Sequence, residues 1–570
     1  MQQLECVSLQ VCVNVLGPLE SVVRRCLGPE GGSVLFTRDT GETLISRHGQ
    51  RVLSTLHLEH PMARMVLDCV CAHAKSTGDG TKSFILLLSA LLRAIQDSTH
   101  MRRKASWSNP ALQNLANRLL ALSRNELDDI IIHQITPYAS SYCSHHSDKL
   151  EHSILDLLIG GYISGRTGAG QAEILKRILC EFFYKSRRDQ NTTETISFIH
   201  SHFDLLHMRV TGLPIGCSEV IEGLVVTRDW SVWTELQGPI KALVLYECFG
   251  SSLGDNITIC FQQDWLSRTE SITKQKLARL LELQVNVLLS SVKQPECVLQ
   301  WARMNHVALL EGVDSDQLDF LCNINFPETL SHPQHIVTLK YCKRLQLGGL
   351  HCAQLGIYSN AHTLVLCAPA PGLLDQTVCV SRGVFAMLQH LSQTLESNQS
   401  QSSSVDQSQC ASEDLWGAVM RAGGVLPVGG VFEFLLHHFL LTRSNCDPVS
   451  SRLLAEALLC VPRALYAHNH RRFLNIQTRF LNDLKKWDRT GVGESDVQFE
   501  LGFSEGLCLE SVGGKQQLVV SVLECLHRLL CVGAVLHTRS PLRPQIYSEE
   551  DEEEEEEVHS NSIQMLTSYL

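Results

Sequence analysis

The segment at residues 77–83, with the sequence TGDGTKS, places the strongest constraint on how this chain folds. Two glycines flank Asp79, so the backbone turns sharply here and approaches a ligand without a Cβ atom in the way. The apolar run at 84–92 predicts a buried helix whose first turn is capped by Thr81 or Ser83. The unpaired N–H groups and the positive dipole end of such a helix attract anions.

The residues of this segment leave two interpretations open. In the first, Asp79 beside the helix start holds a Mg²⁺ ion that a bound triphosphate also coordinates. In the second, the segment is a glycine-rich turn before a core helix and has no ligand. It is not a Walker A loop, because Thr81 separates Gly80 from Lys82 and no glycine stands at the required upstream spacing.

The amount of apolar sequence indicates a globular protein with large cores. Hydrophobic residues make up 44% of the 570 residues and charged residues 19%, which excludes a disordered chain. Nine of the acidic residues stand together at 549–557, so the net charge of −12 falls to about −3 without them. This near-neutral body does not predict a nucleic-acid surface. The acidic segment itself is expected to be a solvated, disordered tail or, alternatively, a contact for a basic partner.

Apolar runs and cysteines bear on the environment of the protein. The first residues lack the basic start and apolar core of a signal peptide, and the run at 84–92 is too short to span a bilayer. The 22 cysteines are scattered, and Cys69 and Cys71 have no second ligand pair near them. We therefore expect reduced thiols in the core of a cytoplasmic protein and no zinc site.

The segments before the glycine-rich turn follow a definite order. A helix is predicted over 8–27, where Pro18 indicates a kink or a break, and a glycine-rich turn follows at 27–32. Two strands at 33–37 and 42–46 then form a hairpin. Pro61 opens the helix that leads to the 77–83 segment.

This order of loops resembles the equatorial nucleotide site of group II chaperonins, a resemblance that covers most of the chain. It implies an α/β multidomain fold with a mainly helical equatorial domain, an intermediate domain and an α/β apical domain. In that family the first loop and the Gly-Asp-Gly-Thr loop enclose the phosphates and Mg²⁺. ATP and Mg²⁺ are thus the implied cofactors, with Asp79 as the metal ligand. The implied nucleotide-binding residues are Leu27, Gly28, Pro29, Gly78, Asp79, Gly80, Thr81, Lys82, Ser83, Gly429 and Gly430.

The resemblance also divides the chain into domains. Its parts are the equatorial domain at 1–125 and 413–545, the intermediate domain at 126–206 and 356–396, the apical domain at 207–355, a polar insertion at 397–412 and an acidic, disordered tail at 546–570. Within the apical part, buried runs at 242–246, 285–289 and 307–310 alternate with helical segments, which independently predicts a parallel layer covered on both faces. The stretch at 250–266 stands for the lid protrusion of the family and is short for one.

Two carboxylates of the family's catalytic machinery are missing from this chain. Group II chaperonins usually carry Asn-Asp-Gly after the hairpin, where this sequence has His48 in place of the aspartate. The aspartate that orients the attacking water matches Gly383, and Asp375 is the only carboxylate nearby. Because phosphoryl transfer depends on positioning and charge, this loss predicts weak or absent ATP hydrolysis. No catalytic residue is assigned.

Motifs at 56–61, 77–83, 290–295 and 425–430 narrow the resemblance to the chaperonin-like Bardet–Biedl branch of the family in vertebrates. That branch implies a chaperone that assists assembly of the Bardet–Biedl complex, the BBSome, in the cytoplasm, at the centrosome or basal body and at the cilium. The implied partners are other chaperonin-like Bardet–Biedl proteins, subunits of the cytosolic chaperonin (TRiC/CCT), and BBSome subunits as clients. One alternative is an ATP-hydrolysing foldase. Another is an unrelated nucleotide enzyme such as a small-molecule kinase, against which the missing Walker A loop argues.

Overall fold

The described residues fall into two units, one within residues 9–531 and a small one that contains the first and last strands. In the small unit, β1 (Leu4–Cys6) pairs with β16 (Ala534–Leu536) in an antiparallel manner. The computed structural model describes residues 4–6, 8–28, 30–37, 41, 43–101, 109–139, 154–187, 192–236, 239–249, 275, 277–325, 336–402, 424–442, 447–467, 470–490 and 508–536. Within these ranges, every helix is too short or too polar to cross a membrane.

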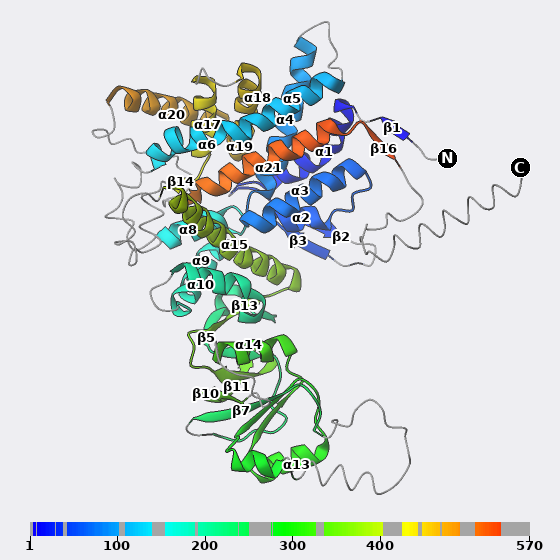
Figure 1. Ribbon diagram of the computed structural model, residues 1–570, viewed down its shortest axis with the longest axis vertical. Coiled ribbons are helices and arrows are strands. Elements are labelled where there is room, and N and C mark those ends of the chain that lie inside the picture. Colours follow the sequence, from blue (N-terminus) through cyan, green and yellow to red (C-terminus); the bar gives the residue numbers. More distant parts are fainter. Residues whose placement is uncertain are drawn as a thin grey trace, which may run out of the picture. The chain divides into compact units, whose positions relative to one another are not determined.

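Helices from both ends of the large unit form one helical group (Figure 1). They are α1 (Leu9–Arg25), α2 (Gly49–Thr55), α3 (Pro61–Thr77), α4 (Thr81–Met101), α5 (Asn109–Asn125), α17 (Val431–Thr442), α18 (Pro448–Leu458), α19 (Cys460–Leu465), α20 (His470–Thr490) and α21 (Val512–Cys531). Within this group, α4 packs against α1, α2, α3, α18, α19 and α21. As predicted, the residues from Phe84 to Leu88 are all almost fully buried. Helix α21 packs against α3, α4 and α5, although about 400 residues separate it from them in the sequence. His527 on α21 bonds Asn117 on α5, with 2.9 Å between the ring nitrogen Nε2 and the amide oxygen Oδ1.

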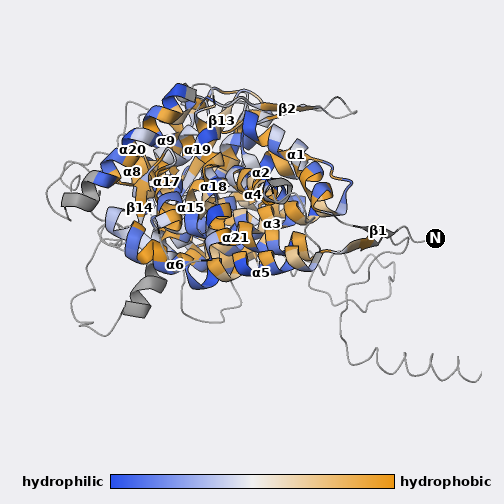
Figure 2. Cartoon of the chain, turned by 90° about the horizontal axis from the view of Figure 1, so that it is seen from above, coloured by the Kyte–Doolittle hydropathy of each residue, from blue (hydrophilic) through white to orange (hydrophobic). Residues whose placement is uncertain are grey.

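The apolar residues of these helices face one another. Figure 2 shows hydrophobic residues concentrated on the helices in the middle of the view, including α17 and α18, while hydrophilic residues are more frequent toward the margins. Helix α1 continues through Pro18 without the break that the sequence suggested. Pro18 removes only one N–H donor, whereas Leu16, Leu19 and Val23 bury a continuous apolar face that holds the helix together.

Two short strand pairs flank this helical group. The predicted hairpin is confirmed as β2 (Val34–Thr37) and β3 (Thr43–Ser46), which pair antiparallel. A second pair joins β14 (Val425–Pro427) to β15 (Leu509–Ser511). Because β15 leads directly into α21, this pair brings the 428–430 turn close to the start of α21.

A second group of helices surrounds a three-stranded sheet. The helices are α8 (Ile154–Ser164), α9 (Ala169–Lys185), α10 (Thr192–Ser201), α11 (Phe203–Leu206) and α15 (Pro371–Ser402), and the strands are β4 (His207–Thr211), β13 (His362–Ala368) and β5 (Glu219–Glu222), in the order β4-β13-β5. Helix α8 continues through Gly160 and Gly161, so only residues 165–168 of the glycine-rich stretch at 160–170 lie between α8 and α9. Helix α15 extends to Ser402, beyond the start of the expected polar insertion, because no glycine or proline interrupts 392–402.

The predicted parallel layer is confirmed by a four-stranded sheet. Its order is β10-β7-β8-β9, with β7 (Ile240–Leu245), β8 (Val287–Ser290) and β9 (Ala308–Glu311) parallel and β10 (Ile336–Leu339) antiparallel to β7. Successive residues of β8 point to opposite faces, and Val287 and Leu288 belong to two different buried clusters. Apolar side chains therefore cover both faces, as parallel sheets require.

Further strands and helices complete this part of the chain. Strands β6 (Leu224–Val226), β11 (Tyr341–Leu347) and β12 (Leu350–Gly356) form a sheet in the order β11-β12-β6, while α13 (Glu296–Met304) and α14 (Ser315–Asn325) follow β8 and β9. The expected protrusion at 250–266, most of the 397–412 insertion and the acidic tail lie outside the described residues.

The close approach of α8 to β15 generates a prediction about stability. A Cβ atom at Gly161 would collide with the carbonyl oxygen of Leu509, whereas one at Gly165 would meet nothing within 4 Å. We expect Gly161→Ala to lower the free energy of unfolding by about 1–3 kcal/mol, because the helix must move away from the strand. The matched control Gly165→Ala should change it by less than about 0.5 kcal/mol. Urea unfolding followed by circular dichroism measures both free energies. Equal losses for Gly161→Ala and Gly165→Ala would contradict the close contact between α8 and β15.

Candidate nucleotide site

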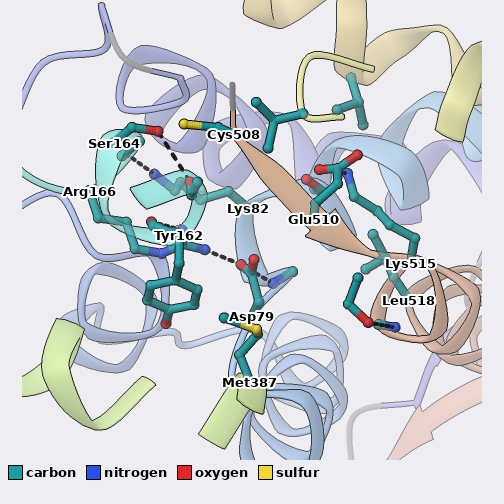
Figure 3. A pocket seen from close by; sticks show the side chains of 18 of the residues that line it. Asp79, Lys82, Tyr162, Ser164, Arg166, Met387, Cys508, Glu510, Lys515 and Leu518 are labelled. Carbon is teal, nitrogen blue, oxygen red and sulfur yellow. Dashed lines mark hydrogen bonds and ion pairs between the residues drawn. The ribbon is translucent and has the colours of Figure 1, made fainter. Parts of the chain in front are cut away.

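A cavity of about 210 Å³ lies where α3 ends and α4 begins. Its walls come from the 27–28 loop, the 77–83 turn, α8 with the residues after it, α15, the 428–429 turn, α19, and β15 with the start of α21. Figure 3 shows Asp79 and Lys515 projecting into this space from different walls. Segments far apart in the sequence therefore share one site.

The glycines of the 77–83 turn have conformations that other residues rarely adopt. Gly78 ends α3 with φ +70° and donates its N–H to Ala74 O at 2.9 Å, and Gly80 has φ +83°. A Cβ atom at Gly78 would lie 2.6 Å from the backbone nitrogen of Met387. The turn thus packs directly against α15, which fixes where α4 starts and where Asp79 lies.

The structure brings together most of the residues that the resemblance assigned to the nucleotide. Those lining the cavity are Leu27, Gly28, Asp79, Gly80, Thr81, Lys82, Ser83 and Gly429. Gly78 and Gly430 stand beside lining residues without lining the cavity themselves, and Pro29 lies outside the described residues. Their role in nucleotide binding stays a prediction.

Asp79 is bound by an arginine that sequence reasoning missed. Arg166, two residues after α8, donates from Nη2 to Asp79 Oδ1, and the Gly80 N–H donates to the same oxygen at 2.5 Å. Burial by itself raises the pKa of Asp79, but the charge of Arg166 and the Gly80 N–H outweigh it and lower the pKa below its ordinary value. The carboxylate is therefore ionised and already paired with a cation.

Arg166 is held in place by its surroundings. Its guanidinium lies 3.7 Å from the centroid of the Tyr162 ring, and Nη1 donates to Tyr162 O. Its own carbonyl accepts a bond of 2.8 Å from Gln376 Nε2 on α15. With 13% of the side chain exposed, Arg166 is a fixed part of the cavity wall. Its only trace in the sequence is one cation within the glycine-rich 160–170 stretch.

Tyr162 occupies space beside the position where the family carries its water-orienting aspartate. Its hydroxyl donates to Gly78 O at 2.7 Å, and burial raises its pKa, so it remains a neutral donor. A Cβ atom at Gly383 would collide with this hydroxyl. The position that the sequence matched to a carboxylate therefore faces a tyrosine from α8. Asp375, the nearest carboxylate on α15, is instead paired with Arg51 and Arg209.

The other unusual residue, His48, supplies no negative charge. It is buried, and burial first, then the charges of Arg166 and Lys82, lower its pKa to about 3. Its Nδ1 atom has no hydrogen-bond partner among the described residues. His48 is therefore neutral at physiological pH.

Lys82 binds backbone carbonyl groups. Its Nζ donates to Cys26 O at 2.8 Å, Arg47 O at 3.3 Å and Gly165 O at 3.4 Å. Burial first, and then the charge of Arg166, lower its pKa to about 8. Lys82 thereby ties the end of α1 to the residues after α8, and it brings a positive charge to the cavity wall.

A buried charge cluster on the opposite wall was also missed. Lys515 Nζ lies 2.8 Å from Glu433 Oε1 and 3.1 Å from Glu510 Oε2. Burial is the largest influence on Glu510 and raises its pKa to about 7. The one sign in the sequence is Glu433, a single charge within the otherwise apolar start of α17.

The side chains present do not fit a Mg²⁺ ion. The described part of the chain has no group of three or more His, Cys, Asp or Glu residues placed to hold a metal. In nucleotide sites Mg²⁺ needs only one or two carboxylates, because phosphate and water oxygens complete its octahedral shell. A carboxylate that a guanidinium already binds is a poorer ligand for it. The expected metal ligand Asp79 is such a carboxylate.

Comparisons with known proteins address the whole chain. The sequence model of the TCP-1/cpn60 chaperonin family matches residues 19–378. A "BBSome complex assembly protein BBS10" from Pongo abelii is 34% identical over 68% of this chain and 58% of the relative. The protein of the same name from Mus musculus is 26% identical over 95% of this chain and 99% of the relative. The chain thus spans little more than half of the length of the first relative and nearly all of the second.

A solved structure supports the predicted fold class. The crystal structure of a group III chaperonin in the open state matches with a TM-score of 0.57 over 92% of this chain and 98% of that chain. Its sequence identity of 15% limits the likeness to the fold. The multidomain chaperonin fold expected from the sequence is confirmed.

The buried cluster around Lys515 generates a prediction about pH. Because the pKa of Glu510 is higher in the folded protein than in the unfolded chain, the folded state binds more protons between about pH 4.5 and 7. Stability should therefore fall as the pH rises through this window. Glu510→Gln should remove that fall, a difference on the order of 1–3 kcal/mol.

Thermal unfolding midpoints between pH 5 and 8 measure this effect. The control is Glu456→Gln, which alters an exposed glutamate on α18 and should leave the pH profile unchanged. Parallel profiles for the unmodified protein and Glu510→Gln would show that Glu510 does not titrate in this range.

Proposed function

The chain belongs to the TCP-1/cpn60 chaperonin family, and we propose that it is a chaperonin-like factor for assembly of the BBSome. In this proposal the cavity at the start of α4 binds ATP, and hydrolysis is weak or absent. The domain boundaries are those that the resemblance to group II chaperonins implies.

One observation carries the assembly role. A relative named for BBSome assembly aligns with 95% of this chain and with 99% of its own length. By contrast, T-complex protein 1 delta subunits such as those of Ochlerotatus triseriatus and Saccharomyces cerevisiae match 27% and 13% of the chain, at 23% and 36% identity. The long alignment favours a role in assembly over that of a general foldase.

The proposed partners are those that the family resemblance implies. They are other chaperonin-like Bardet–Biedl proteins, subunits of the cytosolic chaperonin, and BBSome subunits as clients. The proposed location is the cytoplasm, including the centrosome or basal body and the cilium. Nine acidic residues at 549–557 support a mixed complex, because identical tails on every subunit of a homomeric ring would repel one another.

The cavity supports nucleotide binding. The glycine turn and the start of α4 offer backbone donors to an anion, and Lys82 and Arg166 add positive charge to the same wall. A triphosphate is the anionic ligand that the family resemblance implies. The Mg²⁺ ion that accompanies it in working chaperonins would need Asp79, and Arg166 occupies that carboxylate.

The charges in and around the cavity argue against turnover. The carboxylates that line the cavity are Asp79 and Glu510, and each is paired with a cation. His48 is neutral, and Gly383 faces the Tyr162 hydroxyl. Each carboxylate that lines the described cavity is therefore in an ion pair, and Glu510 keeps one oxygen, Oε1, without a hydrogen-bond partner among the described residues.

The role in assembly predicts a cellular outcome. Cells that lack this protein should contain a smaller fraction of fully assembled BBSome on size-exclusion chromatography, and re-expression of the chain should restore it. Parental cells provide the control. An unchanged elution profile after its loss would contradict the assembly role.

The paired carboxylates predict negligible ATP hydrolysis. Phosphate release by the purified protein should be about 10³-fold or more below that of a working chaperonin, since His48 and Gly383 stand where the family resemblance expects carboxylates. Gly383→Asp alone should not raise the rate, because Tyr162 blocks that position. Robust phosphate release that Asp79→Ala abolishes would favour the ATP-hydrolysing foldase instead.

A further inference from the structure

The carboxylate that the resemblance assigns to a metal ion is already neutralised by a side chain of the protein. Arg166 donates to Asp79 Oδ1, and Figure 3 shows this contact within the cavity. Both bonds to this carboxylate, from Arg166 and from the Gly80 N–H, go to Oδ1. A Mg²⁺ ion that approached Oδ2 would meet a carboxylate whose charge Arg166 already balances, and it would lie close to the guanidinium. In a partly buried site, a guanidinium and a metal ion on the same carboxylate repel each other strongly.

Arg166 is ordered before any ligand arrives. Stacking on Tyr162, the bond to the Tyr162 carbonyl and the bond from Gln376 fix its position. A fixed guanidinium loses little conformational freedom when it binds an anion. Arg166 also lines the cavity, and its guanidinium carries five N–H donors, more than the bonds to Asp79 and Tyr162 use.

The charges on this wall favour an anion without a metal. Lys82 and Arg166 bring two positive charges, and Asp79 brings one negative charge. The hydrogen bonds of Lys82 go to neutral carbonyl groups, so its charge is not balanced by them. On the opposite wall, Lys515 lies between Glu433 and Glu510, which makes that side the less favourable one for phosphate.

We propose that this cavity binds the phosphates of its nucleotide without a divalent metal ion, with the guanidinium of Arg166 supplying the charge that a metal supplies elsewhere in the family. This inference rests on the proposed nucleotide binding. A guanidinium offers phosphate several parallel N–H donors, which makes it a suitable replacement for a cation that bridges phosphate oxygens.

The first test compares binding with and without metal. A fluorescent ATP analogue is titrated into the full-length protein in excess Mg²⁺ and in excess EDTA. The two dissociation constants should agree within about threefold. A loss of more than about tenfold in EDTA would overturn the metal-independent site and leave nucleotide binding intact. Absence of binding under both conditions would overturn nucleotide binding itself and this inference with it.

Substitutions at the ion pair give opposite expectations for the two modes of binding. Arg166→Gln should weaken binding in EDTA by about 10- to 100-fold, because a charge-assisted contact is lost. Mg²⁺ should recover part of that loss, since Asp79 becomes available to a metal. Asp79→Asn should keep or tighten binding in EDTA because it releases Arg166. If Asp79→Asn binds the analogue more weakly than the unmodified protein in Mg²⁺ but not in EDTA, Asp79 holds a metal and the proposal is overturned.

Two further variants distinguish a loss of nucleotide binding from a folding defect. Arg177→Gln makes the same change at an exposed position on α9 and should leave both dissociation constants unchanged. Arg166→Lys keeps the charge but loses the planar donor geometry, so its affinity in EDTA should lie between those of the unmodified protein and Arg166→Gln. Equal affinities of the unmodified protein, Arg166→Lys and Arg166→Gln, at unchanged thermal midpoints, would overturn the role of Arg166.

Discussion

The contact between the Gly78–Gly80 turn and α15 is the constraint on which the rest of the site depends. Gly78 allows α15 to pass so closely that a Cβ atom would lie 2.6 Å from the Met387 nitrogen. This packing ends α3, starts α4 at Thr81 and directs Asp79 toward Arg166. The Tyr162 hydroxyl on α8 donates to the Gly78 carbonyl, so α8 and α15 both hold this turn in place.

The parts of the fold that the sequence predicted are those with local causes. Glycines with positive φ, the strand alternation of the β2–β3 hairpin and the apolar runs of β7, β8 and β9 each act within a few residues. The missed features depend on distant segments. Arg166 meets Asp79 across 87 residues, and Lys515 meets Glu433 across 82. No periodicity in the sequence records such a pairing, although a lone charge in an apolar helix marks one partner.

Replacing a metal ion by an arginine changes what a nucleotide does for such a protein. A working chaperonin hydrolyses its bound ATP, and each turnover drives a conformational cycle. A ligand that is bound but not consumed acts only through mass action, because it stabilises the state that binds it by an amount set by its concentration and affinity. For an assembly factor, such a nucleotide would be a structural component that stabilises the folded chain for as long as it stays bound. The paired carboxylates and the neutral His48 are consistent with that use.

Helix α21 joins the helical group from the far end of the chain. It packs on α3, α4 and α5, and its bonds from His527 to Asn117 and from Gln516 to Asp128 span 410 and 388 residues. On the ribosome, the faces of those early helices that α21 covers stay uncovered until residues 512–531 have emerged. Such high contact order means slow folding and long exposure of apolar surface. A protein proposed to assist the assembly of other chains therefore itself exposes apolar surface during much of its synthesis.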